Sequence, residues 1–215
     1  MKEVITIDGP SGAGKSTLAR LCAKRLGYKY LDTGALYRAV AWKVKQDNVD
    51  PDDEEALRKA LADLRLTLNG DGISVNGADV TSLIRTAELG ELSSRVSAKP
   101  AVRAFLFSIQ REAGLKGKVV VEGRDTGTTI FPDAENKFFL DAGVEERAKR
   151  RYEELKLRDP GISVEKTIKD LQKRDLRDST RESSPLKKTD DMIYIDTSKL
   201  SIEEVVEKII GSLKK

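Results

Sequence analysis

The sequence has no histidine, and its 215 residues include a single cysteine. Without histidine, general acid–base catalysis by an imidazole and metal sites with imidazole ligands are excluded. A single cysteine cannot form a disulfide within the chain, which is typical of proteins in a reducing compartment. We therefore expect a cytoplasmic protein.

Long apolar runs and a strong excess of one charge are also missing. No stretch approaches the roughly 20 apolar residues of a membrane-spanning helix, and no signal peptide is recognisable. The 39 Lys and Arg residues nearly balance the 36 Asp and Glu residues, which leaves a net charge of +3. So small an excess does not indicate a nucleic-acid partner. We expect no membrane and no nucleic-acid partner, and the mixed charge suits a monomer.

The most informative segment is rich in glycine and lies near the N-terminus. Residues 4–17 read V-I-T-I-D-G-P-S-G-A-G-K-S-T, which fits the phosphate-binding pattern G-x-x-x-x-G-K-[ST]. An apolar run at 4–7 predicts a strand before the glycines, and a helical pattern starts at Lys15 and stops before Gly27. This context between a strand and a helix disfavours an accidental glycine-rich turn.

The residue types in this segment suit a nucleoside triphosphate. Glycine allows backbone N–H groups to crowd around an anion, and the following helix adds its positive N-terminal end. Lys15 is expected to reach the β- and γ-phosphates, and the Ser16 hydroxyl is expected to hold Mg²⁺. The residues predicted to bind ATP are Gly9, Pro10, Ser11, Gly12, Ala13, Gly14, Lys15, Ser16 and Thr17.

Strand and helix patterns alternate along the rest of the chain, which predicts an α/β fold with a parallel sheet of about five strands. Strands are expected at residues 4–7, 29–31, 118–122, 137–140 and 192–195. Residues 66–75 alternate differently around an Asn-Gly-Asp-Gly turn, and indicate a small antiparallel insertion. Residues 94–102 are interpreted as a polar hinge that leads into a helix, with Arg103 off its apolar face.

Arginines gather in the most charged region, residues 145–188. Arg147 and Arg151 are four apart and share a helix face. A second helical stripe holds Arg174, Arg177, Asp178 and Arg181. A solvated surface with weak ion pairs would explain such stripes in most proteins. In a chain with a phosphate-binding loop, we interpret the region as a lid that closes arginines over a polyphosphate.

Several motifs in order resemble those of bacterial cytidylate kinases, in the nucleoside monophosphate kinase superfamily. The matching stretches are residues 5–17 above, L-D-T-G-A-L-Y-R at 31–38, I-R-T-A-E-L at 84–89, E-G-R-D-T-G-T-T-I-F-P-D-A at 122–134, E-E-R-A-K-R-R at 145–151, and R-D-x-R-D-x-x-R at 174–181. The second and fourth stretches are more specific than the first, which many kinases share. The resemblance covers essentially the whole chain.

The resemblance implies a three-layer P-loop NTPase core with a helical lid. The core would comprise residues 1–34, 101–148 and 186–215. Residues 35–100 would form the monophosphate-binding region, with the β insertion near 66–80, and residues 149–185 would form the lid.

The same resemblance implies transfer of the ATP γ-phosphate to CMP or dCMP. The residues implied to bind the acceptor are Thr33, Tyr37, Arg38, Ser94, Arg103, Arg124, Asp125, Asp178 and Arg181. Ser94 and the Arg124–Asp125 pair would read the cytosine, and Asp178 would contact the ribose. Arg38, Arg103 and Arg181 would hold the acceptor's phosphate. The residues implied to act on the transferring group are Lys15, Arg147, Arg151 and Arg174.

Phosphoryl transfer needs positioning and charge neutralisation rather than a catalytic base, so the lack of histidine is no obstacle. The chain departs from many relatives at Glu122, where they have Asp.

Other functions were weighed against this one. A UMP/CMP kinase or a dephospho-coenzyme A kinase would share the loop and the lid but not the Arg124–Asp125 segment. A GTP-dependent switch usually carries an N-K-x-D stretch, which is missing here. A basic RNA-binding module would need aromatic residues among its arginines, and residues 174–190 have none.

Overall fold

The computed structural model describes residues 1, 3–157 and 161–214, which divide into two compact units. The first unit comprises residues 1–31 and 113–215, and the second comprises residues 32–112. The lid predicted at 149–185 includes residues 158–160, which lie outside the described residues. No helix among the described residues is long and apolar enough to cross a membrane.

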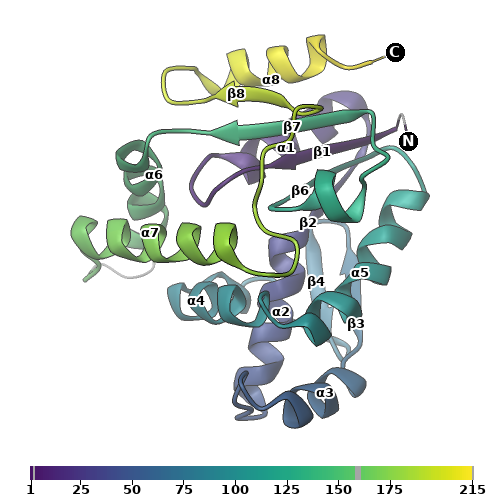
Figure 1. Cartoon of the computed structure of the whole chain (residues 1–215), viewed down its shortest axis with the longest axis vertical. Coiled ribbons are helices and arrows are strands. Elements are labelled where there is room, and N and C mark those ends of the chain that lie inside the picture. Colours follow the sequence, from purple (N-terminus) through teal and green to yellow (C-terminus); the bar gives the residue numbers. More distant parts are fainter. Residues whose placement is uncertain (2, 158–160, 215) are drawn as a thin grey trace. The chain divides into compact units, whose positions relative to one another are not determined.

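A five-stranded sheet organises the first unit, in the order β2-β6-β1-β7-β8 (Figure 1). Its strands are β1 (Val4–Asp8), β2 (Lys29–Asp32), β6 (Val119–Gly123), β7 (Asn136–Asp141) and β8 (Ile193–Asp196). β1 pairs in parallel with β6 and β7, and β7 pairs in parallel with β8. The central strands β1 and β6 are buried at every residue, as their continuous apolar sequences predict. The predicted α/β fold is confirmed.

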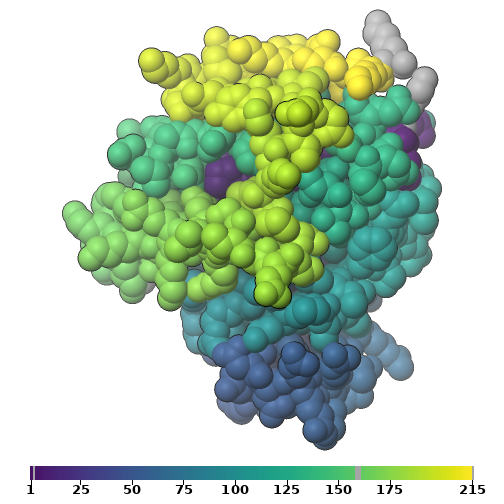
Figure 2. Space-filling view, viewed as in Figure 1, coloured from purple at the N-terminus to yellow at the C-terminus, as the bar shows by residue number. Residues whose placement is uncertain are grey.

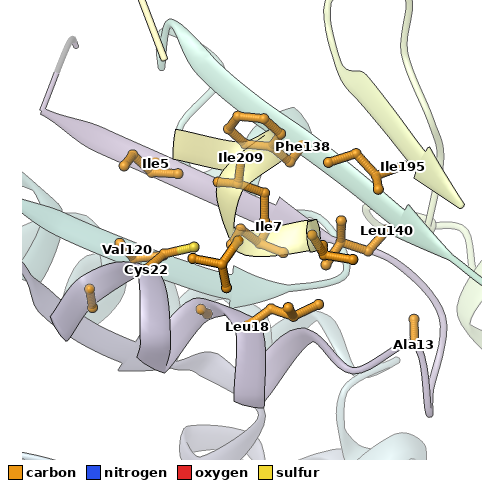
Figure 3. Close-up of a cluster of buried hydrophobic side chains, with 14 residues drawn as sticks. Ile5, Ile7, Ala13, Leu18, Cys22, Val120, Phe138, Leu140, Ile195 and Ile209 are labelled. Atoms are coloured by element: carbon orange, nitrogen blue, oxygen red, sulfur yellow. The ribbon is translucent and has the colours of Figure 1, made fainter. Parts of the chain in front are cut away.

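Helices α1 (Lys15–Leu26) and α8 (Ile202–Gly211) pack against one another in this unit. Figure 3 shows how Leu18 and Cys22 of α1 and Ile209 of α8 meet apolar side chains of the strands, including Ile7 and Phe138. α1 ends at Gly27, and α8 starts with the reciprocal capping box of Ser201 and Glu204, both as predicted. This core holds β1 and the start of α1, between which the glycine-rich loop runs.

Two further helices, α6 (Val144–Lys156) and α7 (Val164–Thr180), pack on one another in the first unit (Figure 1). The Ser163 side chain accepts the backbone N–H of Lys166 and so caps the start of α7. The arginine-rich stripe predicted from the sequence is thus largely helical, with Arg181 just beyond the last turn. A short π-helical segment, η2 (Thr126–Ile130), follows β6 and was not predicted.

The second unit combines helices with a three-stranded antiparallel sheet. Its helices are α2 (Thr33–Gln46), α3 (Glu54–Ala62), the 3₁₀ turn η1 (Leu83–Arg85), α4 (Ala87–Val96) and the greater part of α5 (Pro100–Leu115). The strands β3 (Leu66–Asn69), β4 (Gly72–Val75) and β5 (Ala78–Asp79) pair in that order. This sheet confirms the antiparallel insertion predicted near 66–80.

The polar hinge predicted at residues 94–102 is wrong. Ser94 lies in the last turn of α4, and α5 already begins at Pro100. The Thr86 side chain caps α4 by accepting the backbone N–H of Leu89, and apolar residues on one face of the helix are buried. The polar composition of residues 91–95 hid this face. Arg103 was also expected off the apolar face of its helix, yet it is buried.

Candidate active site

The glycine-rich loop has the crowded backbone that phosphate binding requires. Gly9 has φ +151°, and a Cβ there would lie 2.0 Å from the carbonyl oxygen of Leu140. Gly14, with φ +84°, is the residue that precedes the first turn of α1. Any larger residue at Gly9 would push the loop away from β7. The loop therefore keeps its path only with glycine at this position.

Lys15 begins α1 and is only 5% exposed. Its Nζ donates a hydrogen bond of 2.6 Å to the carbonyl oxygen of Pro10, at the other end of the loop. Burial lowers the pKa of Lys15 to about 7, and the positive charges of Arg124 and Arg174 act in the same direction. The carboxylates of Glu122 and Asp8 act in the opposite direction and favour the charged lysine. A bound polyphosphate would add negative charge beside this group and favour its ammonium form further.

Ser16 and Thr17 follow Lys15 and are both exposed in the first turn of α1. Among residues 1, 3–157 and 161–214, no group of three or more acidic or thiol side chains could hold a metal ion. Mg²⁺ in nucleotide enzymes usually has only one or two protein ligands, because phosphate oxygens and water complete its shell. An exposed Ser16 hydroxyl beside a phosphate-binding loop fits such a site.

Two buried carboxylates lie at the ends of the central strands. Glu122, the penultimate residue of β6, accepts a hydrogen bond of 2.7 Å from the Tyr30 hydroxyl. Asp8, the last residue of β1, accepts from the backbone N–H groups of Thr126 and Gly127 and from the Thr126 hydroxyl. Burial raises the pKa of Asp8 to about 6, although these hydrogen bonds oppose the rise. No role was predicted for Asp8 or Tyr30 from the sequence.

An ion-pair cluster connects the segment after β6 with the end of α7. The Nε of Arg124 donates to Asp178 over 2.9 Å, and the Nε of Arg174 lies 3.9 Å from the same carboxylate. Arg181 donates to Asp125 over 3.0 Å. Burial opposes ionisation of Asp178, yet the charges of these three arginines hold its pKa below the ordinary value. The structure thus brings together five of the residues singled out from the sequence.

Arg147 of α6 is buried against the glycine-rich loop. Its Nε donates to the carbonyl oxygen of Ala142 over 2.9 Å, and its Nη1 donates to that of Ser11 over 3.0 Å. Arg147 also pairs with Asp175 of α7, whose carboxylate accepts the Ser11 backbone N–H over 3.3 Å. In Figure 2 part of the N-terminal segment (purple) is visible beside α6 and α7 (green). Asp175 was missed, although it stands in the motif at 174–181.

Arg151 lies one turn beyond Arg147 on α6 and has a different environment. Its Nη1 pairs with Glu154 of the same helix over 2.7 Å. The helical spacing of the two arginines is therefore as predicted. Their surroundings differ, because Arg147 contacts the loop backbone and Arg151 contacts a neighbouring side chain.

In the second unit, Thr33, Tyr37 and Arg38 share the first turns of α2. Asp32 caps this helix by accepting the Ala35 backbone N–H, and it also accepts a hydrogen bond of 2.8 Å from Arg85. Burial opposes ionisation of Asp32, but Arg38 and Arg85 hold its pKa below the ordinary value. Arg85 stands in the motif at 84–89, and no role was predicted for it.

Two more predicted residues of the second unit are buried polar groups. Ser94 of α4 is 2% exposed, and its hydroxyl makes no hydrogen bond to any described residue. The Arg103 guanidinium of α5 lies 5.8 Å from the centre of the Tyr37 ring and donates to the Ser97 carbonyl oxygen. A buried hydroxyl without a partner is costly in a folded protein, and it favours a role in binding.

Comparisons with known proteins agree on one family. The sequence model of the cytidylate kinase family matches residues 5–215. A cytidylate kinase of Geobacter sp. strain M21 is 47% identical over 215 residues, which are 98% of this chain and 92% of the relative. Those of Carboxydothermus hydrogenoformans and Bacillus subtilis are 48% and 46% identical, with at least 95% of each chain covered.

A solved structure supports the fold alone. An uncharacterized protein from Eubacterium ventriosum superposes with a TM-score of 0.56 at 15% sequence identity. The alignment covers 99% of this chain and 98% of that protein.

Proposed function

Because the chain belongs to the cytidylate kinase family, we propose that it transfers the γ-phosphate of ATP to CMP or dCMP, giving ADP and CDP or dCDP. The observation that carries the proposal is the buried Lys15 at the start of α1, beside Arg124 and Arg174. These groups concentrate positive charge where a polyphosphate would gain most from it. A parallel sheet that ends at a glycine-rich loop supplies the rigid support that phosphoryl transfer requires.

The donor nucleotide would bind through residues 9–17. The backbone N–H groups of the loop and the start of α1 would receive its phosphates, and Lys15 would contact the β- and γ-phosphates. Ser16 would hold Mg²⁺, which supplies charge neutralisation at the phosphate oxygens. Support comes from the exposure of Ser16 and from the close approach of Gly9 to β7.

Arginines would neutralise the charge that develops during transfer. Arg174 lies in the cluster around Asp178 and Arg147 contacts the loop backbone, so both are fixed near the phosphate-binding loop. Arg151 pairs with Glu154 and would exchange this partner for a phosphate oxygen. Guanidinium groups suit this role because they bind phosphate oxygens in pairs.

The acceptor would be bound through its base, its ribose and its phosphate. Ser94, Arg124 and Asp125 would read the cytosine, and Asp178 would contact the ribose. Arg38, Arg103 and Arg181 would hold the acceptor's phosphate, with Thr33 and Tyr37 as further contacts. Two observations support these roles. The buried Ser94 hydroxyl has no hydrogen-bond partner in the part of the chain that the structure describes, and the Arg103 guanidinium lies over the Tyr37 ring.

This function implies a division of labour along the chain. We propose a catalytic core at residues 1–34, 101–148 and 186–215, a monophosphate-binding region at 35–100, and a lid at 149–185. We further propose that the protein is a cytoplasmic monomer, in keeping with its mixed surface charge and single cysteine. CMP and dCMP would be its partners, without a nucleic acid or a membrane.

The decisive experiment measures ADP release with ATP and Mg²⁺ against CMP, dCMP, UMP, AMP, GMP and dephospho-coenzyme A. We expect strong turnover with CMP and dCMP and little with the others. ATP should turn over only when an acceptor is added, which separates a kinase from a nucleotide-dependent switch. Strong turnover with a different acceptor would overturn the assignment of Ser94, Arg124 and Asp125 to cytosine recognition.

A further inference from the structure

A single carboxylate joins two functional segments of the first unit. Asp8 is the last residue of β1, and Gly9 after it opens the glycine-rich loop. The Asp8 side chain is 0% exposed. It accepts hydrogen bonds of 2.9 Å from the Thr126 N–H, 2.8 Å from the Thr126 hydroxyl and 2.7 Å from the Gly127 N–H. All three donors belong to the segment that follows Arg124 and Asp125.

This segment has an unusual backbone. η2 (Thr126–Ile130) is a single π-helical turn, in which the Phe131 N–H donates to the Thr126 carbonyl oxygen over 2.7 Å. No side chain of the turn itself caps its start. The first N–H groups of such a turn have no partner within it, and Asp8 accepts two of them from a neighbouring strand. The carboxylate therefore replaces the local cap that the sequence 125–130 lacks.

The orientation of this turn bears on acceptor recognition. Arg124 and Asp125 lie between the end of β6 and the turn, so the direction in which the chain enters η2 determines where both side chains point. They also make the ion pairs with Asp178 and Arg181. Isolated π-helical turns are rare and occur often at functional sites, where they re-aim the backbone.

We propose that Asp8 is a positioning residue for acceptor recognition: its carboxylate fixes the start of η2 and thereby orients Arg124 and Asp125 toward the cytosine. This rests on the proposed function. Because Asp8 directly precedes Gly9, the same side chain fastens the base-reading segment to the start of the donor's phosphate-binding loop. Asp8 itself would touch neither nucleotide.

The three hydrogen bonds explain why an acid is needed. Each of the three groups that hydrogen-bond to the carboxylate is a donor, and an ionised carboxylate has only acceptors. In an Asp8→Asn variant one side-chain position becomes an amide NH₂ group. This group would face the Thr126 or Gly127 donors, so at least one hydrogen bond would be lost at nearly unchanged volume.

The test compares steady-state kinetics of Asp8→Asn and Thr126→Val with wild type. Thr126→Val removes only the hydroxyl hydrogen bond and leaves β1 and the phosphate loop untouched. We expect the KM for CMP to rise about tenfold in Asp8→Asn and less in Thr126→Val, as the loss of one well-placed hydrogen bond implies. In Thr126→Val the KM for ATP should stay within about twofold, because the backbone of the phosphate-binding loop is unchanged.

Two controls separate positioning from general loss of stability. Thr126→Ser restores the hydroxyl and should restore the KM for CMP. Ile209→Val trims a buried core side chain of the same unit, at a cost of about 1 kcal/mol in stability. It should lower the melting temperature without changing the KM for CMP. A rise in KM in this control equal to that of Thr126→Val would overturn the positioning role.

The outcomes also distinguish this inference from the proposed function. If wild type turns over CMP and Thr126→Val keeps its KM and its preference for CMP over UMP, the positioning role is wrong and the function stands. If wild type turns over another acceptor, the function is wrong. If Asp8→Asn does not fold, Thr126→Val and Thr126→Ser still decide the question.

Discussion

Lys15 shows at the scale of one residue how function and stability oppose each other. Its ammonium group is buried, and burial together with Arg124 and Arg174 lowers its pKa to about 7. A lysine whose folded pKa lies below its unfolded value costs stability whenever the folded state must hold the proton. We expect a bound phosphate to offset this cost, because it would pair with the buried ammonium group.

A Lys15→Met variant should therefore lose activity and gain stability. Removing one charge from the transferring phosphates should lower kcat/KM by about 10²–10³-fold. The melting temperature of the free protein should rise at pH 6, because a buried charge is replaced by an apolar chain of similar length. Steady-state kinetics and thermal unfolding measure both effects. Retained turnover would exclude Lys15 from the phosphate site.

The raised pKa of Asp8 should make the protein less stable as pH rises. Its pKa of about 6 in the folded state exceeds the ordinary 3.8, so its contribution to stability is present at low pH and is lost as pH rises through 6. Between pH 5 and pH 8 the loss should be about 1 kcal/mol. The free energy of unfolding, measured with denaturant, should fall by this amount more in wild type than in Asp8→Asn as pH rises from 5 to 8. A difference independent of pH would contradict the raised pKa.

Arg124 offers a test of acceptor recognition. Arg124→Ala removes a guanidinium assigned to the cytosine and should raise the KM for CMP about tenfold or more, with a smaller change for ATP. Arg95→Ala is the matched control, because the ion pairs of Arg95 with Asp50 and Asp52 lie at the surface. It should leave both KM values unchanged. Equal rises for CMP and ATP in Arg124→Ala would argue against base recognition.

At the scale of the element, local signals explain what the sequence predicts well. α1 runs from the glycine-rich loop to Gly27, and α8 starts with a capping box, so residues within four positions define their ends. β1 and β6 are continuous apolar runs, which are typical of strands buried on both faces. These elements need no knowledge of distant residues.

The features that were missed depend on partners far away in the sequence. The buried face of α4 includes Gly90, Ser93 and Ser94, so the helix lacks a continuous apolar pattern in the sequence. η2 receives its cap from Asp8, more than a hundred residues earlier. Asp175 and Tyr30 acquire significance only through Ser11, Arg147 and Glu122. The motifs point to the arginines and to their partners Asp125 and Asp178, but not to Asp8 or Asp175.

The cap of α7 provides a test of the lid. Ser163→Ala should remove the cap hydrogen bond to Lys166 and destabilise the start of α7 by about 1 kcal/mol. If α7 forms part of a closing lid, the KM for ATP should rise about two- to threefold, because a smaller fraction of molecules would have α7 ordered for closure. Ser201→Ala removes the corresponding cap of α8 and should leave kinetics unchanged. Equal kinetic effects of the two variants would contradict the lid.

At the scale of the whole molecule, the two nucleotides should protect different parts of the chain. A non-hydrolysable ATP analogue should slow amide hydrogen exchange in the first unit, around the glycine-rich loop and α7. CMP should slow exchange in the first turns of α2 and in the segment around Ser94. Mass-spectrometric hydrogen exchange with each ligand alone tests this division. Protection of the first unit alone by CMP would remove α2 and α4 from acceptor binding.

The ion pairs of the first unit have a consequence for how nucleotides bind. The pairs join Arg124 to Asp178, Arg181 to Asp125, and Arg147 to Asp175. The free protein thus carries its own counterions, held by covalent attachment rather than drawn from solution. If Arg147 and Arg181 contact phosphate oxygens as proposed, nucleotide binding exchanges their carboxylate partners for phosphate oxygens, and few ions are released to the bulk. Affinity should then depend on ionic strength far less than the number of arginines would suggest.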